Sequence, residues 1–307
     1  MTTNEASNTP LVSIVVPTYN HATFLRNAIN SIRAQTYTNW QASVVNNFST
    51  DDTIDIVTGF NDDRILLINF YNEGVIAASR NQGIRHATGE FVAFLDSDDV
   101  WYPEKLATCV SILQEGNDLV CHGELWVGES LRPREVRYGP RLRATYDQLL
   151  YRGNCISTSA TVVRRSNLVA LNGFSERKDF VTAEDYELWL RISNQTQKIA
   201  FIPEILGEFR RHQGNASNAV LRNMSAELAV IAHHFSGQDS SIAKRLRQRH
   251  RRGRAYYGAG RGLYASGDNT QSLRLFARSF ATSPFLFRLY PAFLLAFVHA
   301  VTSREKH

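Results

Sequence analysis

The stretch EFVAFLDSDD, residues 90–99, joins an apolar run directly to an acidic one. Residues 90–95 predict a strand that runs straight into the acidic residues. Asp96 and Asp98 stand two positions apart and offer hard oxygen ligands to a divalent cation that also binds phosphate oxygens. A solvated acidic turn that caps the next helix is the alternative, because so short a motif often occurs by chance.

The residues before this stretch alternate between strand and helix patterns. Residues 11–17 are apolar, rich in β-branched side chains and closed by proline, which is typical of a strand buried on both faces. Further strands are expected at 42–45 and 64–70, and helices at 22–35, 54–60 and 75–87. This alternation predicts an α/β fold with a Rossmann-like, mostly parallel sheet flanked by helices.

Polar clusters follow three of the expected strands at the points where the strands end. They are Thr18-Tyr19-Asn20, Asn46-Asn47 and the acidic residues 96–99. In a parallel sheet with right-handed crossovers, the carboxyl ends of the strands form one edge, and ligands bind there. We therefore expect the three clusters to converge.

The pattern becomes α+β after residue 100 and purely helical near the C-terminus. Strands are expected near 118–127, 157–163 and 198–203, an irregular stretch at 128–143 and a helix at 183–193. Four helices are expected in the tail, at 217–235, 240–266, 269–282 and 285–300. The chain therefore adds an α-helical C-terminal region to an α/β domain.

The composition is that of an ordinary globular protein, with 43% hydrophobic and 21% charged residues in 307. The three cysteines show neither CxxC nor zinc-ligand spacing, so we expect buried free thiols in a reducing compartment. The N-terminus has no basic leader, and no apolar run reaches the roughly 18 residues that a spanning helix needs. A cytoplasmic location is expected, at the inner face of the plasma membrane if the tail contacts lipid.

Many short motifs stand in the order found in family 2 glycosyltransferases, which the chain resembles over about residues 11–215. The motifs are VSIVVPTYN at 12–20, STDDT at 49–53, ASRNQG at 78–83, ATGE at 87–90, FLDSDD at 94–99, PEKL at 103–106, GF at 173–174 and ED at 184–185. The resemblance implies a GT-A fold, an inverting mechanism, a nucleotide-diphosphate sugar donor, with a UDP-sugar expected, and Mg²⁺ or Mn²⁺. It divides the chain into a disordered N-terminus at 1–10, a GT-A domain at 11–215 and a helical region at 216–307. Residues 11–100 would bind the nucleotide sugar and 101–215 the acceptor.

The resemblance also implies roles for residues at the expected edge. The residues expected to bind the nucleotide sugar are Pro17, Thr18, Tyr19, Asn20, Asn47, Arg80, Asp96, Ser97 and Asp98. Asp98 is the expected metal ligand, Asp96 and Asp99 flank it, and His212 is a further candidate for the metal or a phosphate. The alternatives are an exposed strand-end aromatic for Tyr19, a helix-surface ion pair for Arg80 and a structural histidine for His212.

Asn47 departs from the family pattern, and Asp185 is the residue expected to carry catalysis. Asn47 stands where many relatives place an aspartate, and an amide brings no charge to a base edge. Asp185 would be the general base that deprotonates the acceptor hydroxyl, with Glu184 and Trp189 on the acceptor side. The alternative for Asp185 is a first-turn residue that only interacts with the helix dipole.

The sequence of the C-terminal helical region is compatible with several binding partners. The basic run at 244–254 and the apolar residues at 285–301 suit an amphipathic segment on anionic lipid, where lipid-linked glycan acceptors are presented. A solvated face or a homodimer surface is the alternative. A nucleic-acid-binding protein is disfavoured, because the N-terminal half lacks arginines interleaved with aromatics. We expect a transferase in surface polysaccharide or O-antigen synthesis, and a non-catalytic nucleotide-sugar-binding protein of the same fold is the competing interpretation.

Overall fold

A computed structural model describes residues 9–128, 131–212, 219–236 and 241–304. The chain divides into two compact units, of which the first holds most residues up to Gln213 and the second holds 150–153, 179–183 and the chain from Gly214 onward. The N-terminus expected to be disordered lies outside the described residues, except for Thr9 and Pro10, whose carbonyls accept hydrogen bonds from Asn39 and Tyr37. The expected domain boundary at 215/216 also lies outside them.

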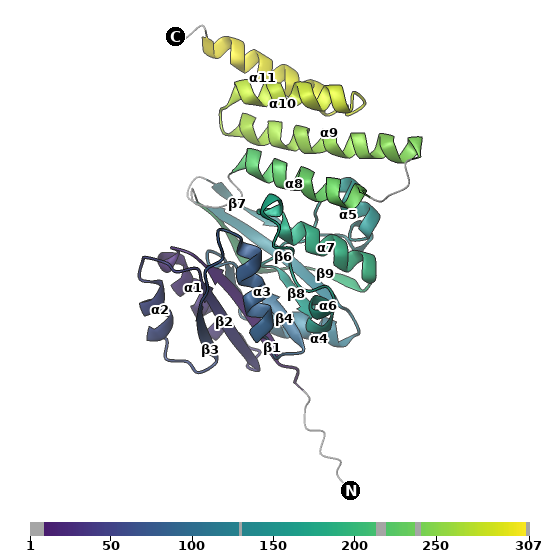
Figure 1. Ribbon diagram of the computed structural model, residues 1–307. Coiled ribbons are helices and arrows are strands. Elements are labelled where there is room, and N and C mark those ends of the chain that lie inside the picture. Colours follow the sequence, from purple (N-terminus) through teal and green to yellow (C-terminus); the bar gives the residue numbers. More distant parts are fainter. Residues whose placement is uncertain (1–8, 129–130, 213–218, 237–240, 305–307) are drawn as a thin grey trace. The chain divides into compact units, whose positions relative to one another are not determined.

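The first half of the first unit is a parallel sheet in the order β3-β2-β1-β4 (Figure 1). The strands are β1 (Val12–Thr18), β2 (Trp40–Asn46), β3 (Ile65–Asn69) and β4 (Phe91–Phe94). Every residue of β1 and β4 is buried, as expected for strands covered on both faces. All four expected strands of this half are confirmed.

The second half extends the same sheet with strands of both directions. Beyond β4 the order is β8-β6-β9-β5, with β7 pairing along the outer part of β6. The strands are β5 (Val100–Trp101), β6 (Leu119–Gly128), β7 (Leu131–Val136), β8 (Thr161–Arg164) and β9 (Ile199–Arg211). The stretch expected to be irregular contains β7. This edge strand carries Pro133 and three charged residues, so it shows no apolar alternation.

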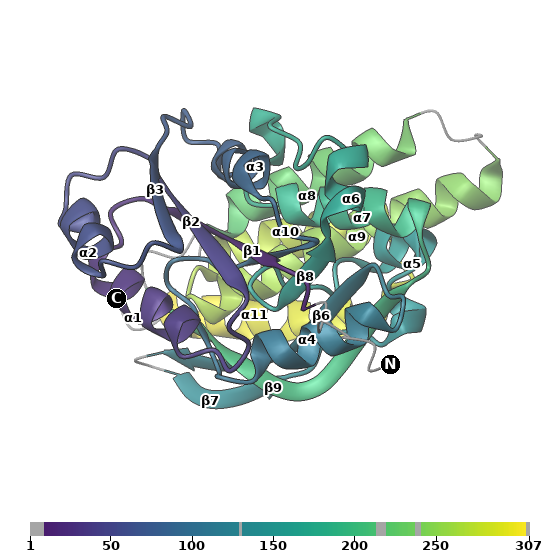
Figure 2. The same ribbon diagram turned by 90° about the horizontal axis from the view of Figure 1, so that it is seen from below.

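Helices cover both faces of the sheet. The helices of this unit are α1 (Ala22–Arg33), α2 (Thr53–Gly59), α3 (Ile76–His86), α4 (Lys105–Gln114), α6 (Arg165–Ala170) and α7 (Glu184–Gln195), with the 3₁₀ turn η1 (Arg141–Arg143). The helix α5 (Tyr146–Arg152) and the 3₁₀ turn η2 (Lys178–Phe180) contain residues of both units. Figure 2 shows α1 and α3 on opposite sides of β1 and β2. On the α3 side Gly83 lies against Val15, where an added Cβ would come within 2.4 Å of a valine methyl. Glycine therefore lets α3 approach the sheet closely.

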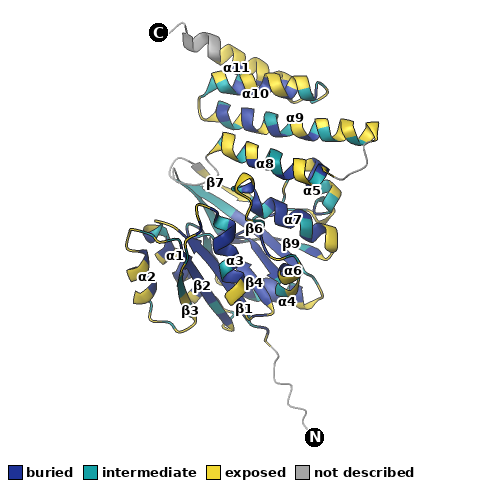
Figure 3. Cartoon of the chain, in the orientation of Figure 1, coloured by how far each residue is buried: buried dark blue, intermediate teal, exposed yellow. Residues whose placement is uncertain are grey.

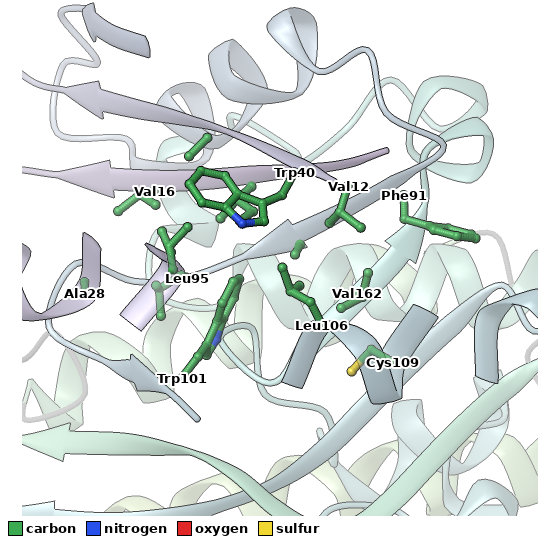
Figure 4. Packing of buried hydrophobic residues seen from close by; sticks show 14 of the residues in the cluster. Val12, Val16, Ala28, Trp40, Phe91, Leu95, Trp101, Leu106, Cys109 and Val162 are labelled. Atoms are coloured by element: carbon green, nitrogen blue, oxygen red, sulfur yellow. The ribbon is translucent and has the colours of Figure 1, made fainter. Parts of the chain in front are cut away.

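One large core lies between the sheet, α1 and α4. Figure 4 shows Trp40, Trp101, Leu106 and Cys109 packed among the strand residues of this cluster. Trp101 donates its indole N–H to the carbonyl of Ser159, which satisfies the polar atom of a buried ring. All three cysteines are free, and Cys109 and Cys121 are buried, as expected, whereas Cys155 is half-buried. The expected α/β fold class is confirmed.

Asp51 starts two helices. Its Oδ1 accepts hydrogen bonds from the backbone N–H and hydroxyl of Thr53, at the start of α2. Its Oδ2 accepts the backbone N–H of Ala22, the first residue of α1, at 2.8 Å. No local sequence pattern indicates that the carboxylate bound at the start of α2 also reaches α1, 29 positions earlier in the chain.

The second unit contains four long helices, as expected. They are α8 (Val220–Phe235), α9 (Ile242–Ala265), α10 (Asn269–Thr282) and α11 (Leu289–Arg304). Small residues bring α9 and α10 together, because the hydroxyls of Ser272 and Ser279 donate to the carbonyls of Gly260 and Gly253. Figure 3 shows exposed residues along α11. None of the helices in the described parts of the chain combines the length and hydropathy needed to cross a bilayer.

The basic run at 244–254 is not a uniformly solvated face. Arg251 is 2% exposed, and its guanidinium bonds to Glu227 and to the carbonyl of Leu150 within this unit. Arg247 lies over the ring of Tyr151, 3.8 Å from the centroid. Some arginines of the run therefore pack within the helical unit and stabilise it, whereas Arg245, Arg249 and Arg252 are exposed.

Candidate active site

The loops after β1 and β2 are tied together at the sheet edge. Asn20 donates its backbone N–H to the Ser49 hydroxyl, and its side-chain oxygen accepts the backbone N–H of Thr50 at 2.8 Å. Asn20 has φ +51°, a left-handed conformation that asparagine tolerates better than most residues. Pro17 and Thr18 are buried, whereas Tyr19 is 54% exposed. The two polar clusters lie together, as the strand order predicts.

The two asparagines after β2 have different surroundings. Asn46 is fully buried, donates to Asn69 Oδ1 and accepts the backbone N–H of Ser49. Asn47 is half-buried, and its side-chain oxygen accepts the backbone N–H of Asn72 at 3.0 Å. Asn46 therefore supports the loop, and Asn47 is the one of the pair that is accessible to a ligand.

Asp99 is held by the neighbouring strands. The carboxylate is 1% exposed and accepts the Ser159 hydroxyl at 2.6 Å and the backbone N–H of Arg210 at 2.9 Å. Burial, followed by the charge of Asp98, raises the pKa of Asp99 well above its usual range. Both carboxylate oxygens bind groups near β8 and β9, so Asp99 joins strands at this point.

Asp98 and His212 come together although they are 114 positions apart in sequence. Asp98 Oδ2 lies 3.0 Å from His212 Nε2, and the two side chains are 12% and 18% exposed. The His212 ring stacks on Phe24 with the centroids 4.4 Å apart, and His21 Nδ1 lies 2.9 Å from the hydroxyl of the buried Ser97. Burial, followed by the charge of Asp96, raises the pKa of Asp98. Sequence reasoning missed His21 and Phe24 as site residues, although His21 directly follows the first polar cluster.

The donor set of this pair suits a divalent cation that is shared with a substrate. The described residues hold no group of three or more acidic, histidine or cysteine side chains arranged around one point. A cation here would have Asp98 and His212 as protein ligands and would need further oxygens from a diphosphate and water. Mg²⁺ typically binds in this way, through one or two carboxylates and substrate phosphates.

Arg80 joins the acidic strand end to α7. It is 4% exposed and donates to Asp96 Oδ1 at 2.7 Å and to Glu184 Oε1 at 2.6 Å. Burial lowers the pKa of Arg80, but the charges of Asp96 and Glu184 more than offset this effect, so the guanidinium stays charged. The ion pair that was the alternative for Arg80 exists, but it lies in the interior and not on a helix surface, and the expected role of Arg80 in binding the donor stays a prediction. Arg80 thus holds both carboxylates in place.

Asp185 lies in the first turn of α7, next to Glu184. It accepts the Thr158 hydroxyl at 3.1 Å, and its side chain is partly exposed. Burial and the charge of Glu184 raise the pKa of Asp185 to about 6, although Arg80 acts in the opposite direction. A carboxylate with a pKa near the working pH is suited to general-base catalysis. Trp189 is fully buried against the Phe174 ring and supports α7 from the core.

Three consecutive hydroxyls before β8 each bind a different carboxylate. Ser157 donates to Glu124, Thr158 to Asp185 and Ser159 to Asp99. Residues 157–160 were expected to be part of a strand, but β8 begins only at Thr161. The run of hydroxyls at 157–159 was the signal that sequence reasoning passed over, because hydroxyl side chains typically bind partners outside regular strands.

Comparisons with known proteins agree on one family. A sequence profile described as Glycosyl transferase family 2 matches residues 13–169. The chain is 34% identical over 230 residues, 72% of its length and 85% of the relative's, to the Escherichia coli protein named UDP-Glc:alpha-D-GlcNAc-diphosphoundecaprenol beta-1,3-glucosyltransferase WfgD. Other relatives have names that refer to colanic acid and teichuronic acid biosynthesis.

Solved structures with the same fold include two that contain nucleotides. S. aureus TarS 1–349 in complex with UDP has a TM-score of 0.63 at 18% identity, over 96% of this chain and 92% of that one. The mannosyltransferase PcManGT from Pyrobaculum calidifontis, in complex with GDP-Man and Mn²⁺, has a TM-score of 0.61 at 17% identity, over 95% and 86%. At these identities the likeness shows the fold alone, which is the expected GT-A fold.

Proposed function

The chain belongs to glycosyl transferase family 2 and is a glycosyltransferase, and from this premise we propose that it transfers a sugar from a nucleoside diphosphate to a hydroxyl of a lipid-linked glycan acceptor. The observation that carries the proposal is the segment 157–159. Its hydroxyls hold Asp185 beside the strand end that carries Asp98. This common support favours a proton acceptor and a diphosphate site on one scaffold.

Asp185 is the proposed general base. The partly exposed carboxylate takes the proton of the acceptor hydroxyl as the oxygen attacks the anomeric carbon opposite the departing diphosphate. The attack inverts the configuration at that carbon. A negative charge close to this carbon also stabilises the positive charge that develops there in the transition state.

Asp98 and His212 are the proposed metal ligands for Mg²⁺ or Mn²⁺. The cation, when bound, neutralises the charge of the leaving diphosphate as a Lewis acid. The chain's own residues do the rest, since Phe24 orients the His212 ring and Arg80 keeps Asp96 beside the site. Asp99, the next residue after Asp98, fixes the chain at this point through its hydrogen bonds to Ser159 and Arg210.

The donor nucleotide is proposed to be UDP. The support is the named UDP-Glc-dependent relative, together with a neighbour of the same fold that binds UDP. In this chain the base would lie near Pro17, Tyr19 and Asn47, at the accessible end of β1 and β2. Asn47 would read the base edge through amide hydrogen bonds rather than through charge.

The acceptor is proposed to be a sugar linked to a lipid by a diphosphate, as in the name of the Escherichia coli relative. The proposed pathway is surface polysaccharide synthesis.

We also propose that α11 lies on the lipid surface at the cytoplasmic face of the membrane. Within α11, Leu294, Leu295 and Phe297 are 62%, 55% and 52% exposed, and such a run of exposed large apolar side chains is typical of an interaction surface. Described acidic residues of the tail after 219 are confined to Glu227 and Asp268, so its charge favours anionic lipid.

One assay tests the activity and a second tests the lipid contact. Purified protein would be incubated with Mn²⁺, a set of radiolabelled nucleotide sugars and a GlcNAc alkyl diphosphate, and transfer would be followed by chromatography. Donor binding without transfer or hydrolysis would favour the non-catalytic interpretation.

The lipid contact is tested by flotation, in which vesicles with and without phosphatidylglycerol are compared. A dimer in light scattering with no flotation would assign the apolar face of α11 to a second copy instead.

A further inference from the structure

A row of three side chains crosses the outer part of the sheet. Strand pairing aligns Trp126 of β6 with Arg134 of β7 and Phe209 of β9. Aligned residues of neighbouring strands point to the same face. The Arg134 guanidinium lies over the Trp126 ring at 5.0 Å from the centroid, and the Phe209 ring lies 5.1 Å from that of Trp126. Arg134 is exposed, and the two rings are half-buried.

The row is connected to the proposed base by a continuous series of contacts. The Trp126 indole N–H donates to the Tyr138 hydroxyl, which donates to the buried Glu124 on the same face of β6. Glu124 also accepts the hydroxyl of Ser157, whose neighbour Thr158 binds Asp185. With a rise of about 3.3 Å per residue, Trp126 lies ~7 Å from Glu124 along the strand. An acceptor with its hydroxyl at Asp185 would reach this row if it ran along β6.

The sheet order separates the row from the nucleotide end. The strands that end in the polar clusters, β1 and β2, lie on one side of β4, whereas β8 and β6 lie on the other. Two strand spacings of about 4.8 Å place β6 ~10 Å beyond β4. A ligand bound to Trp126, Arg134 and Phe209 would therefore lie beyond the acidic end of β4, on the side away from β1 and β2.

A cation–π contact with an aromatic ring does not use the N–H groups of a guanidinium as hydrogen-bond donors. Those groups match the oxygens of a phosphate in a bidentate arrangement. The cation–π contact holds the guanidinium in one orientation, so less side-chain entropy is lost on binding. Trp126, which packs against Phe209, thus positions Arg134 as an anion-binding group.

We propose that Arg134, oriented by Trp126, binds the diphosphate through which the acceptor sugar is attached to its lipid. This inference rests on the proposed function for the identity of the acceptor. It assigns a determinant of acceptor specificity to β7, a strand outside the segment from 11 to 100 expected to bind the donor. Trp126 acts as a positioning residue.

The test compares two probes with the full chain in the presence of UDP and Mn²⁺. One probe is an alkyl diphosphate of α-GlcNAc, and the other is the alkyl α-glycoside of GlcNAc, which lacks the diphosphate. Calorimetry gives the Kd of each probe for the wild type, Arg134→Ala, Arg134→Lys and Trp126→Phe. Arg137→Ala is the matched control, because Arg137 is an exposed arginine just after the same strand, three positions away, that pairs with Glu135.

We expect the wild type and the control to bind the diphosphate probe about tenfold more tightly than the glycoside, since a hydrogen bond to a charged group has this effect. Arg134→Ala should reduce the preference to about twofold or less, Arg134→Lys should retain only part of it, and Trp126→Phe should retain most of it. UDP affinity should not change. An equal preference in Arg134→Ala, no preference in the wild type, or a loss of UDP affinity instead would overturn the assignment. Sugar transfer is measured separately, so a failed transfer assay rejects the proposed function while the binding preference still decides this inference.

Discussion

Thr158 donates its hydroxyl to Asp185 Oδ2 at 3.1 Å, and Asp185 is thereby tied to the segment that also holds Asp99. The helix α7, which carries the proposed base, and the acidic strand end therefore have a common support. Catalysis depends on such fixed distances between reacting groups, because a misplacement of about 1 Å can slow a reaction by about 10²-fold. The predictions below test the parts of this arrangement one at a time.

Replacing Asp185 by asparagine should abolish most of the sugar transfer. The amide has nearly the same shape but cannot accept the proton, and general-base catalysis typically contributes ~10²–10⁴-fold. Asp55→Asn, an exposed residue of α2, is the matched control and should keep full activity. Transfer rates and UDP affinity are measured together, and an unchanged rate in Asp185→Asn would reject the base assignment.

The rate should fall as the pH decreases through about 6. The pKa of Asp185 is raised to about 6, so the carboxylate is the main form above that pH and the inactive acid is the main form below it. Thr158→Val removes a hydrogen bond that favours the carboxylate, so the acid limb of the kcat/KM profile should move to higher pH. Coincident profiles for the two proteins would show that another group controls this limb.

Removing the charge of Arg80 should destabilise the first unit. Arg80→Gln leaves Glu184 and Asp96 without their buried partner, and breaking such a pair costs about 3 kcal/mol. Thermal unfolding followed by circular dichroism measures the effect. Arg85→Gln, an exposed position on the same helix, should change stability by about 0.5 kcal/mol or less. Equal Tm shifts in the two variants would contradict the proposed role of Arg80.

His212→Ala should weaken metal activation and not the fold. Loss of one protein ligand should raise the Mn²⁺ concentration for half-maximal activity by about tenfold or more, while saturating Mn²⁺ restores part of the rate. His86→Ala, an exposed residue of α3, provides the control. A lower rate with an unchanged Mn²⁺ requirement would remove His212 from the metal site.

Two glycines of α9 should respond oppositely to alanine. A Cβ on Gly260 would lie 2.6 Å from the Phe276 ring, so Gly260→Ala should destabilise the helical unit by about 1–3 kcal/mol. Gly258 has no atom within 4 Å of that point, so Gly258→Ala should stabilise α9 by up to about 1 kcal/mol. Urea unfolding of the full chain measures both, and destabilisation of equal size would contradict close packing of α9 on α10.

The periodic elements were predictable from the sequence, and the contacts between them were not. Buried strands such as 90–95 and the tail helices have patterns that span many residues, so their type follows from the sequence alone. The pairing of Asp98 with His212 and the placement of Arg80 depend on chain folding over long separations, which no local pattern encodes. The edge strand β7 was missed because its charged residues and proline carry no strand signal.

The shared cap at Asp51 has a consequence for engineering donor preference. The loop after β2 lies near the proposed nucleobase site, and its Asp51 also begins α1, the helix that carries Phe24 under the His212 ring. A loop transplanted from another family member would alter the start of α1 unless it brought an equivalent carboxylate. The proposed nucleobase site and the ring under the proposed metal ligand therefore share one structural support, and a change to the loop is expected to affect both.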